Sequence, residues 1–314
     1  MKILITGGAG FIGSNLVERL INNNQVYVVD NLSTGNYENL KEFEANINFH
    51  FFNIDISKSE FIEFIKTNMF DVIYNLACPA SPQYYLEHPI ETWESSVLGI
   101  RNLLEGIKDT NTKLFHSSTS EVYGNALQIP QKEEYWGNVN QIGVRACYDE
   151  GKRAAEALIY DYIRKYNVDV RVARIFNTYG PKMRKEDGRI ISNFVNQALF
   201  NQDITIYGTG KQTRSFCYID DTLDFIIKLM NITSKIDGPI NVGNPVEVSV
   251  LDVALFIKEK IQTNSEIIFK EAMKDDPQRR KPDISKAKEI LDWEPKVPFE
   301  IGLNKVITYF KGRK

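Results

Sequence analysis

The feature that most constrains the fold is a glycine-rich turn between a short apolar run and an amphipathic segment. Residues 2–6 are mostly apolar, and the turn Gly7-Gly8-Ala9-Gly10-Phe11-Ile12-Gly13 follows directly. Residues 14–22 carry apolar side chains at helical spacing, and a second apolar run at 25–29 ends at Asp30. This order of strand, glycine turn, helix, strand and acid predicts a βαβ unit at the N-terminus.

Strand-like and helix-like segments continue to alternate along the first half of the chain. We expect strands at 47–52, 72–76, 113–117 and 168–175, and helices at 59–67, 90–108 and 149–165. This alternation predicts an α/β fold with a doubly wound parallel sheet of the Rossmann type and helices on both faces.

After residue 178 the predicted elements become shorter. We expect helices at 192–200 and 251–260, and strands at 204–207 and 239–242. The chain is therefore predicted to form a Rossmann domain at 1–178 and a smaller α/β substrate lobe at 179–314, with some interleaving back to the first domain around 213–245.

Charge and cysteine content exclude several classes of protein. The 314 residues include 38 Lys and Arg against 41 Asp and Glu, so no basic excess points to a nucleic acid or a membrane surface. No apolar run reaches the length of a membrane span. Three scattered Cys form neither a disulfide framework nor a zinc knuckle, so we expect no metal and a reducing, cytoplasmic location.

The glycine pattern and Asp30 together predict a dinucleotide site. The glycines permit a tight turn and let the backbone and the helix N-terminus approach a pyrophosphate. Asp30, 20 residues after Gly10, can accept both ribose hydroxyls and would repel a 2′-phosphate, which favours NAD over NADP. Asp55 contacts the adenine or caps the turn near Ser57, and the sequence leaves both readings open. The residues expected to line the cofactor site are Gly7, Gly10, Phe11, Ile12, Gly13, Asp30, Asn31, Ser33, Thr34, Gly35, Asp55, Ile56, Leu76, Tyr148 and Lys152.

A second motif, Tyr148-x-x-x-Lys152, predicts a site of proton transfer. The i, i+4 spacing places both side chains on one face of a helix. An ammonium near a phenol favours the phenolate, which is the base needed to remove a hydroxyl proton. Ser118 or Thr119, at the end of the preceding strand, could hold that hydroxyl.

With these motifs in place, the chain resembles the extended short-chain dehydrogenase/reductase superfamily, and within it the UDP-glucuronate decarboxylase (UDP-xylose synthase) family. The segments that carry the resemblance are 76–82, 118–124, 135–140, 147–153, 173–181, 212–216 and 275–283. The resemblance implies NAD-dependent oxidation of UDP-glucuronate at carbon 4, loss of carbon dioxide, and return of the hydride to give UDP-xylose.

The chemistry of one tripeptide supports this subfamily. Related 4,6-dehydratases carry Thr-Asp-Glu where this chain has Thr119-Ser120-Glu121. Dehydration needs an acid and a base, whereas a 4-keto sugar acid loses carbon dioxide with the ketone as electron sink. A nucleotide-sugar 4,6-dehydratase or 4-epimerase on the same scaffold is the alternative. An NAD-sensing protein without activity is a third reading, which the intact catalytic motif disfavours.

The resemblance also implies roles for individual residues. The implied catalytic residues are Thr119, Glu121, Tyr148, Lys152 and Arg280, and the implied substrate-binding residues are Ser120, Asn177, Arg184, Arg189, Tyr207, Arg214 and Arg280. From sequence alone, Arg280 could equally belong to a solvated basic run at 279–281, and Tyr207 could be a core residue.

One departure from the family pattern bears on substrate recognition. Glu94 stands where these decarboxylases typically have Lys, which questions the recognition of an acidic sugar. The superfamily also often dimerises through the helix of the Tyr148 motif and the long helix before it. We therefore expect a homodimer, with Ala154, Ala155, Ala157, Leu158 and Tyr162 as candidate contacts that are equally consistent with ordinary packing.

Overall fold

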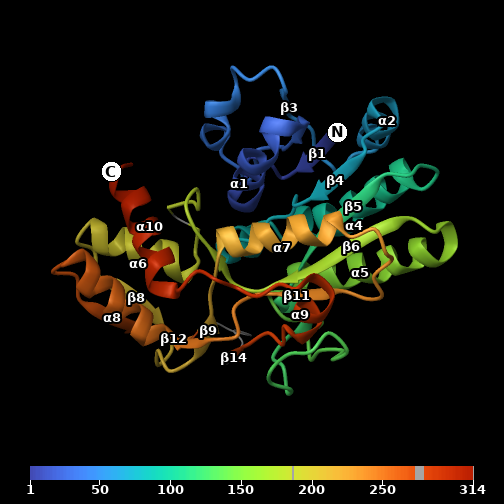
Figure 1. Cartoon of the computed structure of the whole chain (residues 1–314). Coiled ribbons are helices and arrows are strands. Elements are labelled where there is room, and N and C mark those ends of the chain that lie inside the picture. The colour runs from blue at the N-terminus through green and yellow to red at the C-terminus, as the bar shows by residue number, and fades with distance from the viewer. Residues whose placement is uncertain (186, 273–278, 314) are drawn as a thin grey trace.

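The computed structural model describes residues 1–185, 187–272 and 279–313. Its main sheet has seven strands in the order β11-β6-β5-β4-β1-β2-β3, and each neighbouring pair is parallel (Figure 1). The strands are β1 (Lys2–Thr6), β2 (Gln25–Val29), β3 (Phe49–Phe52), β4 (Val72–Asn75), β5 (Lys113–Thr119), β6 (Asp169–Ile175) and β11 (Ile240–Val242). This order confirms the predicted doubly wound parallel sheet.

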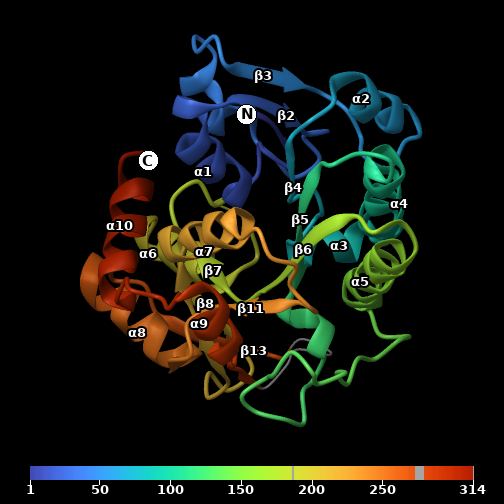
Figure 2. The ribbon, with the colours of Figure 1, turned by 45° about the vertical axis from the view of Figure 1, so that its right-hand side comes forward.

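Helices cover both faces of the sheet. Figure 2 shows α2 (Glu60–Asn68), α4 (Pro89–Ile107) and α5 (Ala146–Tyr166) together on one face, while α1 (Phe11–Leu20) and α7 (Ile219–Asn231) lie on the other. Successive strand side chains point to opposite faces. Ile3 and Ile5 therefore belong to the core beneath α1, and Leu4 belongs to the core beneath α4.

The C-terminal residues form a smaller α/β lobe beside the carboxyl ends of the main strands. Its helices are α6 (Ile190–Leu199), α8 (Val250–Ile261), α9 (Ser285–Leu291) and α10 (Phe299–Lys311). Its strands form two small sheets, β8 (Ile204–Tyr207) with β13 (Ile267–Lys270), and β9 (Thr213–Ser215) between β12 (Glu247–Ser249) and β14 (Arg279–Arg280). A short parallel pair, β7 (Thr178–Tyr179) and β10 (Cys217–Tyr218), lies where the chain enters the lobe.

One hydrophobic core runs from the main sheet into this lobe. It includes Ile3 of β1, Phe225 of α7, Val253 of α8 and Phe310 of α10, all of them buried. Helix α7 and strand β11 return to the main sheet after the chain has entered the lobe. The boundary between 1–178 and 179–314 therefore does not separate two cores, and the division into two domains is a proposal about function. None of the described helices is long and apolar enough to cross a membrane.

Two helices that carry site residues start earlier than the sequence predicts. Helix α1 begins at Phe11 because Gly10, in extended conformation, already serves as its N-cap. Helix α5 begins at Ala146, so Tyr148 lies inside its first turn. The sequence analysis does not predict α3 (Pro82–Glu87), α7, α9 or α10, although the buried residues Ile219, Leu223 and Ile226 of α7 recur at helical spacing.

A buried carboxylate holds α7 against the chain that leads into α10. Asp221 is 3% exposed, and its two oxygens accept the backbone N–H groups of Lys296 and Val297, each at 2.9 Å. We predict that Asp221→Ala lowers the free energy of unfolding by about 1 to 3 kcal/mol, because two partly buried N–H groups lose their buried acceptor. Urea unfolding measures this loss. Asp224→Ala, on the exposed side of the same helix, should change stability by about 0.5 kcal/mol or less, and an equal effect of both changes would contradict the prediction.

Candidate active site

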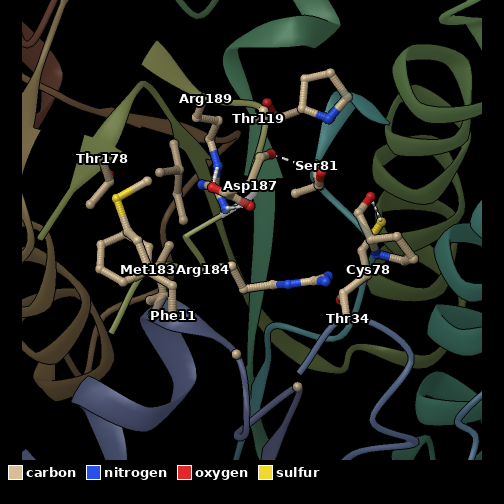
Figure 3. Close-up of a pocket in the computed structure, with 18 of the residues that line it drawn as sticks. Phe11, Thr34, Cys78, Ser81, Thr119, Thr178, Met183, Arg184, Asp187 and Arg189 are labelled. Carbon is tan, nitrogen blue, oxygen red and sulfur yellow. Dashed lines mark hydrogen bonds and ion pairs between the residues drawn. The ribbon is translucent and has the colours of Figure 1, made fainter. Parts of the chain in front are cut away.

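A pocket lies between the carboxyl ends of the main strands and the C-terminal lobe (Figure 3). It lies at the carboxyl ends of the paired strands β1 and β4, where the strand order of the sheet reverses, which is where doubly wound sheets hold their ligands. Every residue that the sequence assigns to the cofactor site, the catalytic set or the substrate site lines this pocket. The structure thus brings together segments that are up to 270 residues apart, and the roles of these residues remain proposals.

The glycine turn leaves the bottom of the pocket open. Gly7 has a φ of +70°, and a side chain on it would lie 2.7 Å from the backbone of Leu76 and Ala77. A side chain on Gly13 would lie 2.2 Å from the carbonyl oxygen of Gly7. No described side chain caps the N-terminus of α1, so its first N–H groups are available to an anionic group. This geometry fits a dinucleotide pyrophosphate.

Asp30 lies at the carboxyl end of β2, beside the glycine turn. Its Oδ2 accepts from the Ala9 N–H at 3.0 Å, and its Oδ1 accepts from the Leu32 N–H at 2.8 Å. Burial raises the pKa of Asp30, although both N–H groups act in the opposite direction. Each carboxylate oxygen retains a second lone pair, which fits the two hydroxyls of a ribose.

Asp55 caps the turn near Ser57, which confirms one of the two readings that the sequence left open. Its Oδ1 accepts from both the backbone N–H and the hydroxyl of Ser57, at 2.8 and 2.7 Å, so it stabilises the turn before α2. Asp55 also lines the pocket beside Asn31, whose amide donates to Oδ2 at 3.3 Å.

Tyr148, Thr119 and Lys152 form the centre of the pocket. The side chains of Tyr148 and Thr119 are hydrogen-bonded to each other. The Thr119 oxygen accepts from the Glu121 N–H at 3.2 Å, so the Thr119 hydroxyl proton can be donated to the phenol oxygen. Lys152, 4% exposed, donates to the carbonyl oxygen of Ser117 at 2.7 Å.

The pKa of Tyr148 departs from the expectation based on Lys152. Burial raises the pKa of the phenol well above its usual value, and the hydrogen bond from Thr119 offsets only part of this. The lowering of the Tyr148 pKa that the sequence predicts is therefore absent in the protein alone, because burial dominates and the Lys152 ammonium is bonded to the Ser117 carbonyl oxygen. Tyr148 is held neutral, and a positive charge on a bound ligand would favour its ionisation.

Glu121 is a partly buried carboxylate between arginines from distant segments. Arg280 donates to both of its oxygens at 3.1 Å, through Nε and Nη2, and Arg145 contacts Oε2. Burial raises the pKa of Glu121, but the charges of Arg280, Arg145 and Arg214 outweigh it and hold the pKa well below its usual range. Glu121 is thus ionised, and Arg280 is a buried partner, not part of a solvated run.

The remaining predicted substrate residues occupy different parts of the pocket. The Arg189 guanidinium is paired with Asp187, and Figure 3 shows this pair beside the pocket, with Arg184 extending into it. Asn177 has a buried Nδ2 without a hydrogen-bond partner among the described residues, as a donor reserved for a ligand would have. Tyr207 is 44% exposed and lines the pocket, so it is not a core residue. Ser120, buried at the end of β5, and Arg214, 6% exposed in β9, also line it.

Glu94, which replaces the lysine typical of these decarboxylases, does not line the pocket. Glu94 forms a partly exposed ion pair with Lys58 at 3.7 Å, whereas its neighbour Ser95 lines the pocket. Residues 275–277, part of the family motif at 275–283, lie outside the described residues.

Two pocket side chains, Tyr85 and Arg145, are absent from the sequence-based prediction. The Tyr85 ring stacks on Tyr148 with centroids 5.3 Å apart, and the Arg145 guanidinium lies 5.7 Å from the Tyr85 ring. The i, i+4 spacing of Arg145 and Asp149 could have indicated from the sequence that Arg145 lies on the same helix face as a carboxylate. Tyr85 had none, because α3 carries it to the pocket through a turn that only the tertiary structure defines.

The fold and the site together define the class of the protein. A glycine turn at the switch point of a parallel sheet, a Tyr-x-x-x-Lys helix and a lobe over the same pocket are features of extended short-chain dehydrogenases/reductases. The family model of GDP-mannose 4,6 dehydratase matches residues 4–306. The chain therefore belongs to this family of NAD-dependent epimerases and dehydratases.

Within the family, the chain is similar to proteins of narrower description. It is 50% identical over 305 residues to UDP-glucuronic acid decarboxylase 3 of Arabidopsis thaliana, an alignment that covers 96% of this chain and 87% of the relative. UDP-glucuronic acid decarboxylase 1 of Xenopus tropicalis is 49% identical over 99% of this chain and 72% of its own length. The solved structure of UDP-glucuronic acid 4-epimerase from Bacillus cereus, in complex with UDP-glucuronic acid and NAD, superposes with a TM-score of 0.91 at 27% identity and covers 100% of both chains.

Asp149 pairs with Arg145, the same arginine that contacts Glu121, and its titration should make the stability of the protein depend on pH. Burial and then the charge of Glu121 raise its pKa to about 7, and Arg145 opposes this. Because the pKa of Asp149 is higher in the folded protein than in the unfolded chain, protonation of this carboxyl favours the folded protein. This contribution is complete at pH values below the unfolded-state pKa and is lost as pH rises through about 7. We predict that wild-type protein loses stability relative to Asp149→Asn between about pH 4 and pH 8.

Urea unfolding at several pH values in this window measures the difference between the two proteins. Asp161→Asn, an exposed change on the same helix, is the control and should follow the wild type at each pH. A constant difference between wild type and Asp149→Asn would contradict the prediction.

Proposed function

We propose that this chain is an NAD-dependent UDP-glucuronate decarboxylase that converts UDP-glucuronate to UDP-xylose. One observation carries the choice within the family: the Glu121 carboxylate accepts two hydrogen bonds from the buried Arg280, and the position beside it is Ser120. A dehydratase uses two acids at this strand end, and the second is missing here. The near 50% identity to UDP-glucuronic acid decarboxylases supports the same choice.

The glycine turn, Asp30 and Lys152 would hold NAD. The cofactor supplies a hydride acceptor that oxidises carbon 4 of the sugar and later returns the hydride to the same carbon. Gly7 and Gly13 keep the backbone open for the pyrophosphate, and Asp30 accepts from the adenine-side ribose. Lys152, on the face of α5 that carries Tyr148, would bind the nicotinamide-side ribose.

Tyr148 is the base for the carbon 4 hydroxyl. Thr119 orients the phenol and can donate to the oxygen on which charge develops. Since burial keeps the phenol neutral, proton abstraction is confined to the complex in which a bound cation offsets that burial. Tyr148 would therefore act as a base only when the oxidised cofactor is bound.

Glu121, Arg280 and Arg145 act at the carboxylate end of the sugar. Once carbon 4 is a ketone, the sugar acid is a β-keto acid and its carboxylate can leave as carbon dioxide. We infer that Arg280 and Arg145 hold the sugar carboxylate near Glu121, and that Glu121 and Arg280 take part in decarboxylation or in reprotonation at carbon 5. Arg184, Arg189 and Arg214, with Asn177 and Tyr207, would bind the UDP moiety.

The experiment that tests the function is incubation with UDP-glucuronate and NAD, followed by mass spectrometry of the nucleotide sugar. We expect the product to have lost the mass of one carbon dioxide, with no accumulation of NADH. Loss of one water from UDP- or dTDP-hexoses would instead establish a 4,6-dehydratase. A UDP-glucuronate isomer of unchanged mass would establish a 4-epimerase.

Tyr148→Phe tests the assigned base. Without the hydroxyl oxygen, no group remains to accept the carbon 4 proton, so we predict that turnover falls by at least about 100-fold. NAD and UDP should still bind with dissociation constants close to those of the wild type, measured by calorimetry. Retained turnover in this variant would show that another residue is the base.

We also propose that the chain forms a homodimer through α4 and α5 and resides in the cytoplasm. Ile90, Trp93 and Leu98 are large apolar side chains exposed along α4. Of the candidate contacts on α5, Ala157 is exposed, while Ala155 is buried in the core and cannot take part. The three cysteines are free thiols, as is typical of proteins in a reducing compartment.

Leu98→Arg tests the dimer. A charge on the shared helix face should convert a wild-type dimer to a monomer, because burying an unpaired guanidinium is costly. Analytical ultracentrifugation measures the mass of each. Leu127→Arg, on an exposed loop away from both helices, should leave the dimer intact. A monomeric wild-type protein would refute the proposal.

A further inference from the structure

Arg280 reaches Glu121 from a strand with few hydrogen bonds of its own. Strand β14 consists of only Arg279 and Arg280, and it pairs with β9 along one edge. Arg279 points to solvent and pairs with Glu247, whereas Arg280 is 1% exposed. Two strand residues cannot hold a buried guanidinium in place by themselves, so the position of Arg280 depends on what contacts the other edge.

Gln131 contacts that other edge with both its backbone and its side chain. Its backbone N–H donates to the Lys281 carbonyl oxygen, and its carbonyl oxygen accepts from the Asp283 N–H, both at 2.9 Å. Its side-chain Oε1 accepts from the Lys281 N–H at 2.8 Å, and Nε2 donates to the Arg279 carbonyl oxygen at 3.4 Å. Gln131 itself is 0% exposed, so this amide is part of the interior.

The same loop also receives the Arg280 side chain. The Nη1 of Arg280 donates to the Gly124 carbonyl oxygen at 2.6 Å, seven residues before Gln131. On the opposite side, the Ser215 hydroxyl donates to the Arg280 carbonyl oxygen at 2.8 Å. Asn241 of β11 supports the contact by donating to the carbonyl oxygens of Gln131 and Asp283 at 3.0 and 3.1 Å. Arg280 is therefore held between β9 and the loop that follows Glu121.

We propose that Gln131 is a positioning residue for Arg280: its buried amide fixes the backbone on both sides of Arg280 and so sets the guanidinium against Glu121. Gln131 is not among the residues that line the pocket, so it acts through Arg280 and not on the substrate. The inference rests on the proposed function, in which Arg280 acts on the sugar carboxylate.

Gln131→Met tests the inference, because it keeps the length of the side chain and removes only the amide. We expect the kcat for UDP-glucuronate decarboxylation to fall by about tenfold or more, since small displacements of a reacting group are costly. The dissociation constants for NAD and for UDP, measured by calorimetry, should stay within about twofold of the wild type.

Thr112→Val is the matched control. Its hydroxyl donates to the Phe70 carbonyl oxygen at 2.7 Å, which is also a buried hydrogen bond from a side chain to the backbone, but at the amino end of β5. It should lower the melting temperature without lowering kcat. Gln131→Glu adds a rescue test: a protonated carboxyl can again donate and accept, so its activity relative to wild type should rise as pH falls.

A double-mutant cycle with Arg280→Lys separates positioning from a general structural role. If Gln131 acts through Arg280, adding Gln131→Met to Arg280→Lys should lower kcat by less than about twofold. If Arg280→Lys has no measurable turnover, the same cycle is read from the dissociation constant of UDP-glucuronate. Multiplicative effects, or wild-type kcat in Gln131→Met, would overturn the inference. Absence of decarboxylation by the wild type would instead refute the proposed function.

Discussion

The Glu121 carboxylate, held by the guanidinium groups of Arg280 and Arg145, is the interaction on which the site depends. It joins the end of β5, the start of α5 and the segment before α9. Removing one partner would leave a poorly solvated charge uncompensated, which is costly, so this contact favours the arrangement in which the three segments meet. The same contacts therefore join the C-terminal lobe to the main sheet and position the catalytic groups.

The parallel sheet supplies the frame for this assembly. All seven strands end on the same edge, and the reversal of strand order between β4 and β1 is the place on that edge where a ligand binds. The glycine turn after β1, Asp30 after β2 and Thr119 at the end of β5 thus face one pocket. A continuous core that extends into α8 and α10 keeps the lobe against this edge.

Local patterns predicted the first half of the chain well. The glycine turn, the apolar strands and the long helices at α4 and α5 follow from spacing alone, because each is stabilised by an amphipathic or fully buried pattern. The starts of α1 and α5 were placed three residues late, since Gly10 and Arg145 act as caps without a side-chain hydrogen bond. Helix α7 was not predicted, although its buried residues follow helical spacing; only its return from the lobe to the main sheet needed the tertiary structure.

The sequence by itself determined the family, the cofactor motif and which residue types do chemistry, because these rest on spacings within single elements. Only the tertiary structure decided how those residues are charged and partnered. It separated Arg280, buried against Glu121, from its exposed neighbour Arg279, and it paired Glu94 with Lys58 outside the pocket. It also brought Tyr85 and Gln131 to the site. Burial and ionic contacts between distant segments set these properties, and neither can be read from the order of residues along the chain.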